Sequence, residues 1–162
     1  MQMNIGVRER KACMRNQVQF LFRLLVTFLV ASPSFAESLS ISCGESQGYA
    51  YYFEGGVVDK ASSGFSKDAI SGGKITLNVN EKGEGDILTI DATGAIKSAK
   101  SQGAQVIVLP TSGTGVNWMA MYSDGTLEVY SYNGNTNKVA SYRNTVGNPV
   151  VAKNSLFISD CQ

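Results

Sequence analysis

The sequence predicts an all-β domain that folds as a small antiparallel β-barrel of about eight or nine up-and-down strands. Three observations support this class: side chains alternate between apolar and polar through residues 37–162, glycine-rich turns separate the alternating runs, and Cys43 and Cys161 lie near the two ends. Successive side chains of a strand face opposite sides, and short connections favour a meander. A β-sandwich is the alternative, because it is also built from many short strands.

Nine runs have the alternation, or the β-branched and aromatic content, that is typical of strands. They are Leu39–Cys43, Gly48–Glu54, Lys74–Asn80, Asp86–Asp91, Ala104–Leu109, Val116–Ser123, Thr126–Asn133, Lys138–Arg143 and Ser155–Ser159. The pair Asp124-Gly125 separates two of them and predicts a hairpin with a type I′ turn. The only helix candidate, Ala92–Gln102, lacks an apolar stripe, so we expect no more than a turn of helix there.

The stretch Gly55–Gly73 interrupts the strand pattern. Loops of this length in a compact domain are usually functional or disordered, and the two Gly-Gly pairs permit hinge-like backbone angles. Its apolar residues can fold back as a plug or lid over one end of the sheet, or can complete the core as a packed crossover. These residues are Val57, Val58, Phe65 and Ile70.

Residues 1–36 have the pattern of a secretory signal peptide. Five basic residues against one acid are followed by the apolar run Leu24–Val30 and by small residues at Ser34 and Ala36. The run is short of the roughly 20 residues that cross a bilayer. We therefore expect cleavage after Ala36, with translation starting at Met1 or Met14, and a single exported domain of residues 37–162 without a membrane span. Periplasm and extracellular medium both fit.

Two cysteines in an exported chain are expected to form a disulfide. A bond between Cys43 and Cys161 would close nearly the whole domain into one loop, which the chain-entropy model values at about 4–5 kcal/mol. It also requires the first and last strands to lie side by side. A redox or metal-binding pair is the alternative, but the sequence has no Cys-x-x-Cys and no ligand cluster nearby.

The composition excludes several kinds of function. The chain has no histidine, which removes histidine-based nucleophiles, general bases and metal ligands. Residues 37–162 carry nine basic and twelve acidic residues, and Arg143 is the single arginine, so the chain does not favour nucleic acid. The acids around Glu84 lack the spacing of a calcium loop. We expect neither an enzyme nor a bound metal or cofactor.

Aromatic residues are the candidate ligand-binding residues. Inward-facing rings would line a cavity for a small apolar or aromatic molecule, with a hydroxyl or indole group to orient it. We predict such roles for Trp118, Tyr122, Tyr51 and Phe65, while cross-strand packing accounts for most of the other tyrosines. Alternation places Tyr49 and Tyr51 on one face of their strand and Tyr52 on the other.

Three short motifs are similar to the plan of the small periplasmic inhibitors of C-type lysozyme. They are Ile41-Ser42-Cys43, Ser112-Gly113 before an aromatic strand, and Asp160-Cys161-Gln162. The resemblance implies an eight-stranded barrel with terminal cysteines, and a Ser-Gly loop that enters the enzyme's cleft. Ser112 and Gly113 would then be protein-binding residues. The chain departs from that plan in the additional stretch 55–73.

The sequence therefore predicts an exported, monomeric, non-enzymatic β-barrel that binds an unidentified partner. A small apolar or aromatic ligand inside the barrel is the first hypothesis. A protein-binding module, such as a lysozyme inhibitor, is the second, and a structural envelope component without a defined ligand is the third.

Overall fold

A computed structural model describes residues 38–91 and 93–162; the predicted signal peptide, residues 1–36, lies outside the described residues. Within the described part the fold is all-β, which confirms the predicted class. It consists of ten antiparallel strands and no helix. The strands are β1 Leu39–Tyr52, β2 Gly64–Ile70, β3 Lys74–Val79, β4 Gly85–Ile90, β5 Ile96–Ser98, β6 Gln105–Pro110, β7 Gly115–Met121, β8 Leu127–Asn133, β9 Lys138–Asn144 and β10 Lys153–Cys161.

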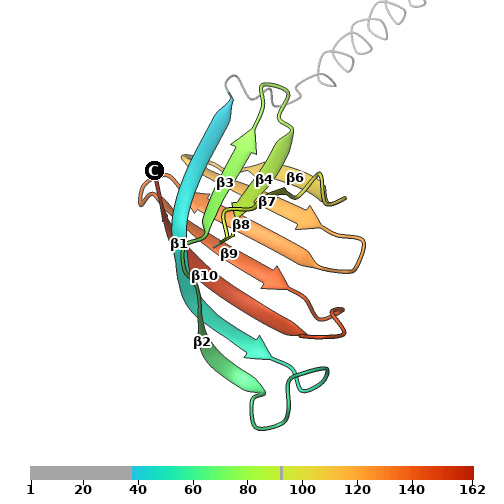
Figure 1. The fold of residues 1–162 in the computed structure, drawn as a ribbon. Helices are drawn as coiled ribbons and strands as arrows, with labels where there is room; N and C mark the ends of the chain where they lie inside the picture. Colours follow the sequence, from blue (N-terminus) through green and yellow to red (C-terminus); the bar gives the residue numbers. More distant parts are fainter. Residues whose placement is uncertain (1–37, 92) are drawn as a thin grey trace, which may run out of the picture. The chain divides into compact units, whose positions relative to one another are not determined.

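The strands form one strongly curled sheet, a partly open barrel (Figure 1). Their order is β5-β4-β3-β1-β10-β9-β8-β7-β6, with β2 also paired to β1. Most neighbours in the sheet are neighbours in the chain, so the predicted up-and-down arrangement is confirmed. The two ends of the order, β5 and β6, are not paired with each other in the described sheet, and the seam of the barrel therefore lies between them.

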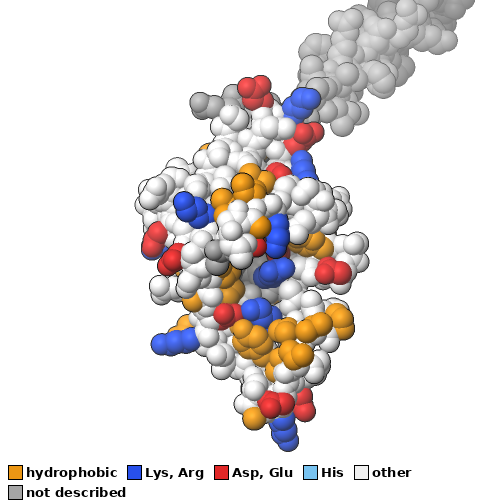
Figure 2. Space-filling model, in the orientation of Figure 1, with side chains coloured by type: hydrophobic (Ala, Val, Ile, Leu, Met, Phe, Trp, Pro, Cys, Tyr) orange, Lys and Arg blue, Asp and Glu red, His pale blue; other side chains and the backbone are white. Residues whose placement is uncertain are grey.

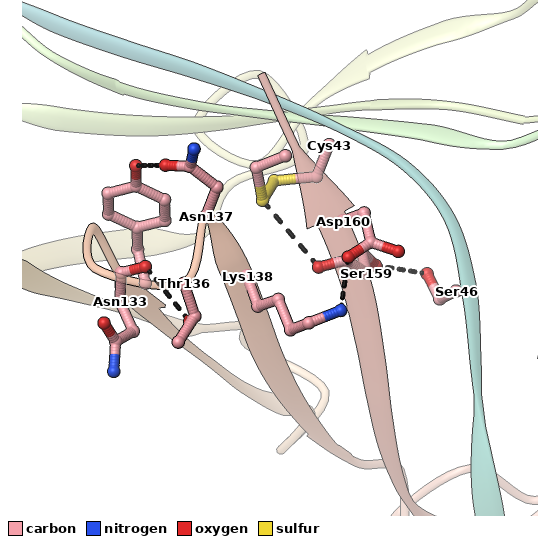
Figure 3. The surroundings of a disulfide bond; sticks show 10 residues. Cys43, Ser46, Asn133, Thr136, Asn137, Lys138, Ser159 and Asp160 are labelled. Atoms are coloured by element: carbon pink, nitrogen blue, oxygen red, sulfur yellow. Dashed lines mark hydrogen bonds and ion pairs between the residues drawn. A yellow bond between two sulfur atoms is a disulfide. The ribbon is translucent and has the colours of Figure 1, made fainter.

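The predicted disulfide joins the first and last strands. Cys43 and Cys161 are register partners of β1 and β10, with 3.9 Å between their Cα atoms and 2.14 Å between their sulfurs. Beside the bond, the Ser159 hydroxyl donates a 3.0 Å hydrogen bond to the hydroxyl of Ser46 (Figure 3). Bonds of this kind form in oxidising compartments.

Strand β1 is unusually long, and two of the predicted runs, Leu39–Cys43 and Gly48–Glu54, are its two halves. A bulge between Cys43 and Ser46 separates them. The first half pairs with β3 and the second with β2, so β2 and β3 are one partner strand broken at residues 71–73. The backbone N–H of Gly72 donates a 2.8 Å hydrogen bond to the Glu45 carboxylate across this break.

The stretch Gly55–Gly73 is therefore not the uninterrupted loop that we expected, because its second half forms β2. The sequence of β2 has no regular alternation of apolar and polar residues, so its periodicity did not identify it as a strand. Among the apolar residues proposed for a lid, Val57 and Phe65 are strongly exposed and Ile70 is partly exposed. The segment as a whole therefore forms neither a plug nor a core-filling crossover, and of these residues only Ile70 reaches the cavity described below.

The remaining differences are local. Of the central turn residues only Gly125 has positive φ, at 84°, so the predicted type I′ turn is wrong. The Gly125 N–H donates to the Tyr122 carbonyl, as in a type I turn followed by a left-handed glycine. The helix candidate contains the short strand β5 instead, which pairs with β4.

One end of the barrel, which we call the closed end, is packed around Trp118. Strand β4 approaches β6 and β7 there, and Trp118 is completely buried. A Cβ placed on Gly85 would lie 2.2 Å from Val108 Cγ2 and 3.1 Å from Trp118 Cδ1, so the absence of a side chain at Gly85 permits this close approach. The indole N–H of Trp118 donates a 3.0 Å hydrogen bond to the Asn78 carbonyl.

The described residues include no helix of the length and hydrophobicity needed to cross a membrane.

Candidate functional site

At the other end, which we call the open end, the curled sheet encloses a cavity of about 540 Å³. Its apolar wall includes Ile70, Ile75, Ile87 and Phe157, while β8 and β9 contribute polar and charged residues. The face shown in Figure 2 is hollowed near its middle, where Lys and Arg side chains flank the hollow. The volume lies within the range of about 300–1,000 Å³ that is typical of small-molecule sites.

The polar wall exists because β8 turns its polar residues inward. Glu128 and Tyr130 lie opposite Arg143 and Ser141 of β9 and are buried, whereas Val129 faces the outer side. Alternation in the sequence predicts these two faces but not which of them is inside. The strand's apolar residues face outward, contrary to the usual expectation for a half-buried strand.

Glu128 is the centre of the polar wall. Its Oε2 accepts hydrogen bonds from the hydroxyls of Tyr122 and Tyr130, at 3.2 and 3.1 Å. Its Oε1 lies 3.0 Å from Nε of Arg143. The Glu128 side chain is 7% exposed, against 55% for Arg143. A carboxylate removed from water needs such partners, since an unpaired buried charge is strongly unfavourable.

The environment of Glu128 keeps both tyrosines protonated. Burial raises the pKa of Tyr122 to about 12, and the neighbouring carboxylate of Glu128 adds to the shift. Burial, followed by the same carboxylate, raises the pKa of Tyr130 well above its usual value. Both hydroxyls therefore remain hydrogen-bond donors to Glu128 at neutral and mildly alkaline pH.

The rim of the cavity carries further charges on the opposite wall. Lys97 of β5 lies 3.4 Å from Asp91, and both side chains are about half exposed. Asp91 also accepts hydrogen bonds from Thr93, which is the main cause that lowers its pKa to about 2. Lys74, at the start of β3, also lines the cavity and has no ion-pair partner among residues 38–91 and 93–162.

The structure separates the four residues predicted to bind a ligand. Tyr122 lines the cavity. Trp118 is fully buried at the closed end and is not part of the cavity wall. Tyr51 and Phe65 lie as register partners on the outer face, with their rings edge to face and their centroids 5.0 Å apart. Phe65 is 84% exposed.

Ser112 and Gly113 lie in the connection between β6 and β7. Residues 111–114 are all exposed, and Gly113 has a φ of 105°. The Thr111 hydroxyl donates a 2.7 Å hydrogen bond to the Gly115 carbonyl, so the two ends of the loop are held together. This loop does not line the cavity.

Sequence reasoning missed Glu128, Tyr130 and Arg143 as a site. The available signal was weak: Glu128 is an acid inside an aromatic strand, and Arg143 is the single arginine of residues 37–162. Their pairing depends on the register of β8 and β9, which the sequence does not reveal.

The described residues contain no group of three or more acidic, cysteine or histidine side chains arranged to hold a metal ion. Comparison of the chain with family models, with curated proteins and with solved structures finds no match.

Proposed function

We propose that the protein is an exported, non-enzymatic binding protein that holds a small ligand in the cavity at the open end. The single observation that carries this proposal is the cavity of about 540 Å³, which joins an apolar wall to an ordered polar wall. An apolar or aromatic body would contact Ile75, Ile87 and Phe157, and a polar group would reach the side where Tyr122 lies. Sites of this composition bind small molecules in many proteins.

Binding accounts for this wall better than catalysis does. Glu128, the one acid buried in the cavity wall, already accepts two tyrosine hydroxyls and contacts Arg143. A carboxylate occupied in this way is a poor general base, because its lone pairs point at its own partners. The arrangement fixes the shape of the wall instead.

Export is part of the proposal. The Cys43–Cys161 bond supports it, since structural disulfides persist in oxidising compartments. N-terminal sequencing and intact-mass measurement of the chain from a secreting host should find a product beginning at Glu37 with no free thiol. A product that retains residues 1–36, or two free thiols, would contradict export.

A fluorescence titration with N-phenyl-1-naphthylamine, a neutral aromatic dye, tests the cavity. We expect saturable binding to the unsubstituted protein and a loss of at least tenfold in affinity for Ser141→Phe, whose ring would occupy the cavity. Ser131→Phe is the matched control, because it adds the same ring to the exposed outer face of the adjacent strand. Native mass spectrometry of the purified protein should show any copurified ligand. If the dye does not bind and no ligand copurifies, the proposal is wrong.

The loop of Ser112 and Gly113 supports a second candidate function, inhibition of a lysozyme. The specific observation is that this loop is exposed and closed by its own hydrogen bond, so it is ready to enter a cleft without reordering. A C-type lysozyme assay should then show inhibition that Ser112→Arg abolishes and Ser131→Arg preserves. Absence of inhibition by the unsubstituted protein would remove this candidate.

A further inference from the structure

We infer that the cavity selects ligands with an anionic head group, such as a carboxylate, sulfonate or phosphate, and that Arg143 and Lys97 hold this group. The inference rests on the proposed function and adds the chemical class of the ligand. Arg143 of β9 and Lys97 of β5 both line the cavity, from different parts of its wall.

The acids of the cavity are already supplied with hydrogen-bond donors. Glu128 accepts from both tyrosine hydroxyls and contacts Nε of Arg143. Asp91 accepts from the backbone and hydroxyl of Thr93 and from the Ala95 N–H, and Lys97 lies beside it. Asp124, the third acid that lines the cavity, accepts a hydrogen bond from the Thr126 N–H. A ligand with an ammonium group would have to compete with these internal partners to reach any of the three acids, which lowers the net gain from binding.

The basic groups, in contrast, keep donors in surplus. A guanidinium has five N–H groups and an ammonium three. Arg143 contacts Glu128 through Nε, which leaves its two terminal amino groups available on a side chain that is 55% exposed. A guanidinium edge of this kind matches the two oxygens of a carboxylate or phosphate. Glu128 would act as a positioning residue that fixes the guanidinium in the wall.

Lys97 and Lys74 add charge on the other side. The ion pair of Lys97 with Asp91 is half exposed and 3.4 Å long, and exposed pairs of this kind are weak enough to rearrange. Lys74 has no carboxylate partner within the described ranges. An anion at the mouth of the cavity would therefore meet basic groups from β3, β5 and β9 without breaking a strong internal contact.

Two dyes with the same ring system distinguish the contribution of the ligand's charge to affinity from the contribution of its rings. N-phenyl-1-naphthylamine is neutral, and 8-anilinonaphthalene-1-sulfonate carries an additional sulfonate. We expect the sulfonate dye to bind about tenfold more tightly than the neutral one at low salt. That preference should shrink as ionic strength rises, because salt screens the exposed charges.

Variants should change the ratio of the two affinities. Arg143→Gln should reduce the preference for the sulfonate dye about tenfold, and Lys97→Gln, which removes a half-exposed charge and leaves the fold intact, should reduce it about threefold. Arg143→Lys should give an intermediate ratio, because it keeps the charge and loses the planar fork. Lys82→Gln is the matched control: Lys82 lies at the exposed tip between β3 and β4, and the ratio should stay unchanged.

The outcomes distinguish a failure of the anion inference from a failure of the cavity proposal. If both dyes bind with equal affinity, and the ratio is the same in all variants, the anion inference is overturned while the cavity proposal stands. If neither dye binds, both are overturned. Tighter binding of the sulfonate dye that depends on Arg143 supports both.

Discussion

The closed and open ends of this barrel are built from the same strands and differ in what points inward. At the closed end Gly85 lets β4 approach β7, and Trp118 fills the space between them. At the open end β8 and β9 direct Glu128 and Arg143 inward, and about 540 Å³ remains unfilled. A wall of charged groups cannot be packed as densely as an indole, because each charge needs donors or water around it.

We propose that stability and ligand binding depend on different ends of one sheet. The completely buried Trp118 and its hydrogen bond to Asn78 lie at the closed end. The disulfide belongs to a buried cluster that contains Trp118 as well as Ile75 and Ile87 of the cavity wall. Closing the barrel there holds β4 and β8 at fixed positions, and the open end can keep a cavity without loss of the fold. Substitutions should therefore separate into those that unfold the protein and those that alter binding.

Trp118→Ala is expected to have the largest effect. Removing a completely buried indole and its hydrogen bond to Asn78 should lower the free energy of unfolding by about 3–5 kcal/mol. Tyr122→Ala at the open end should cost less than half as much, because its ring borders a cavity. Urea unfolding followed by circular dichroism measures both. Equal losses of unfolding free energy for the two variants would show that the two ends do not differ in their contribution to stability.

Removing the disulfide should come next. The paired substitution of Cys43 and Cys161 by alanine releases a loop with a sequence separation of 118 residues and should lower the free energy of unfolding by about 2–5 kcal/mol. The same dye affinity is expected in the refolded variant under native conditions, because neither cysteine lines the cavity. Dye binding that disappears while the circular dichroism spectrum stays native would show that the disulfide controls the shape of the cavity directly.

Glu128→Gln should have a smaller effect on stability. The substitution keeps the shape of the side chain and removes the charge that Arg143 and two tyrosine hydroxyls contact. A loss of about 1–3 kcal/mol is expected, typical of hydrogen bonds to a charged group. Thermal and urea unfolding check this value. A loss as large as that of Trp118→Ala would mean that the open end is part of the stabilising core.

The smallest expected effect is a pH dependence that comes from Tyr122. Its pKa is about 12 in the folded protein, above the value of about 10 for an exposed tyrosine. Its contribution to stability is therefore complete below about pH 10 and is lost as the pH rises toward 12. The urea midpoint of the unsubstituted protein should fall more steeply across that window than the midpoint of Tyr122→Phe. Parallel curves would show that the hydroxyl is not held as described.

Much of the fold could be predicted from the sequence, because alternation and turn chemistry are local. All nine predicted runs overlap strands of the sheet, with ends that differ by one or two residues, and the pairing of Cys43 with Cys161 correctly placed the first strand beside the last. Strand β2 was missed because its sequence does not alternate between apolar and polar residues. Strand β5 was missed because three residues are too few to show a periodic pattern. The turn at Gly125 was assigned the wrong type because the same dipeptide serves both geometries.

The candidate site was less accessible to sequence reasoning. The faces of β8 were separated correctly, but the polar face is the inner one, and only the register of β8 with β9 shows that Glu128 meets Arg143. Trp118 was predicted to bind a ligand because it is a large aromatic residue, but it is completely buried away from the cavity. Its burial depends on Gly85, a residue 33 positions away in the chain, which no local pattern connects to it.

The most direct test of the central claim is a map of amide chemical shifts during a titration with N-phenyl-1-naphthylamine. If the open end accepts the ligand, the amide signals of Thr89, Glu128 and Ser141, which line the cavity, should shift in a saturable way. The amide signal of Val79, the register partner of Gly85 at the closed end, should not shift. Shifts that gather instead around Phe65 on the outer face, or around the closed end, would contradict the account.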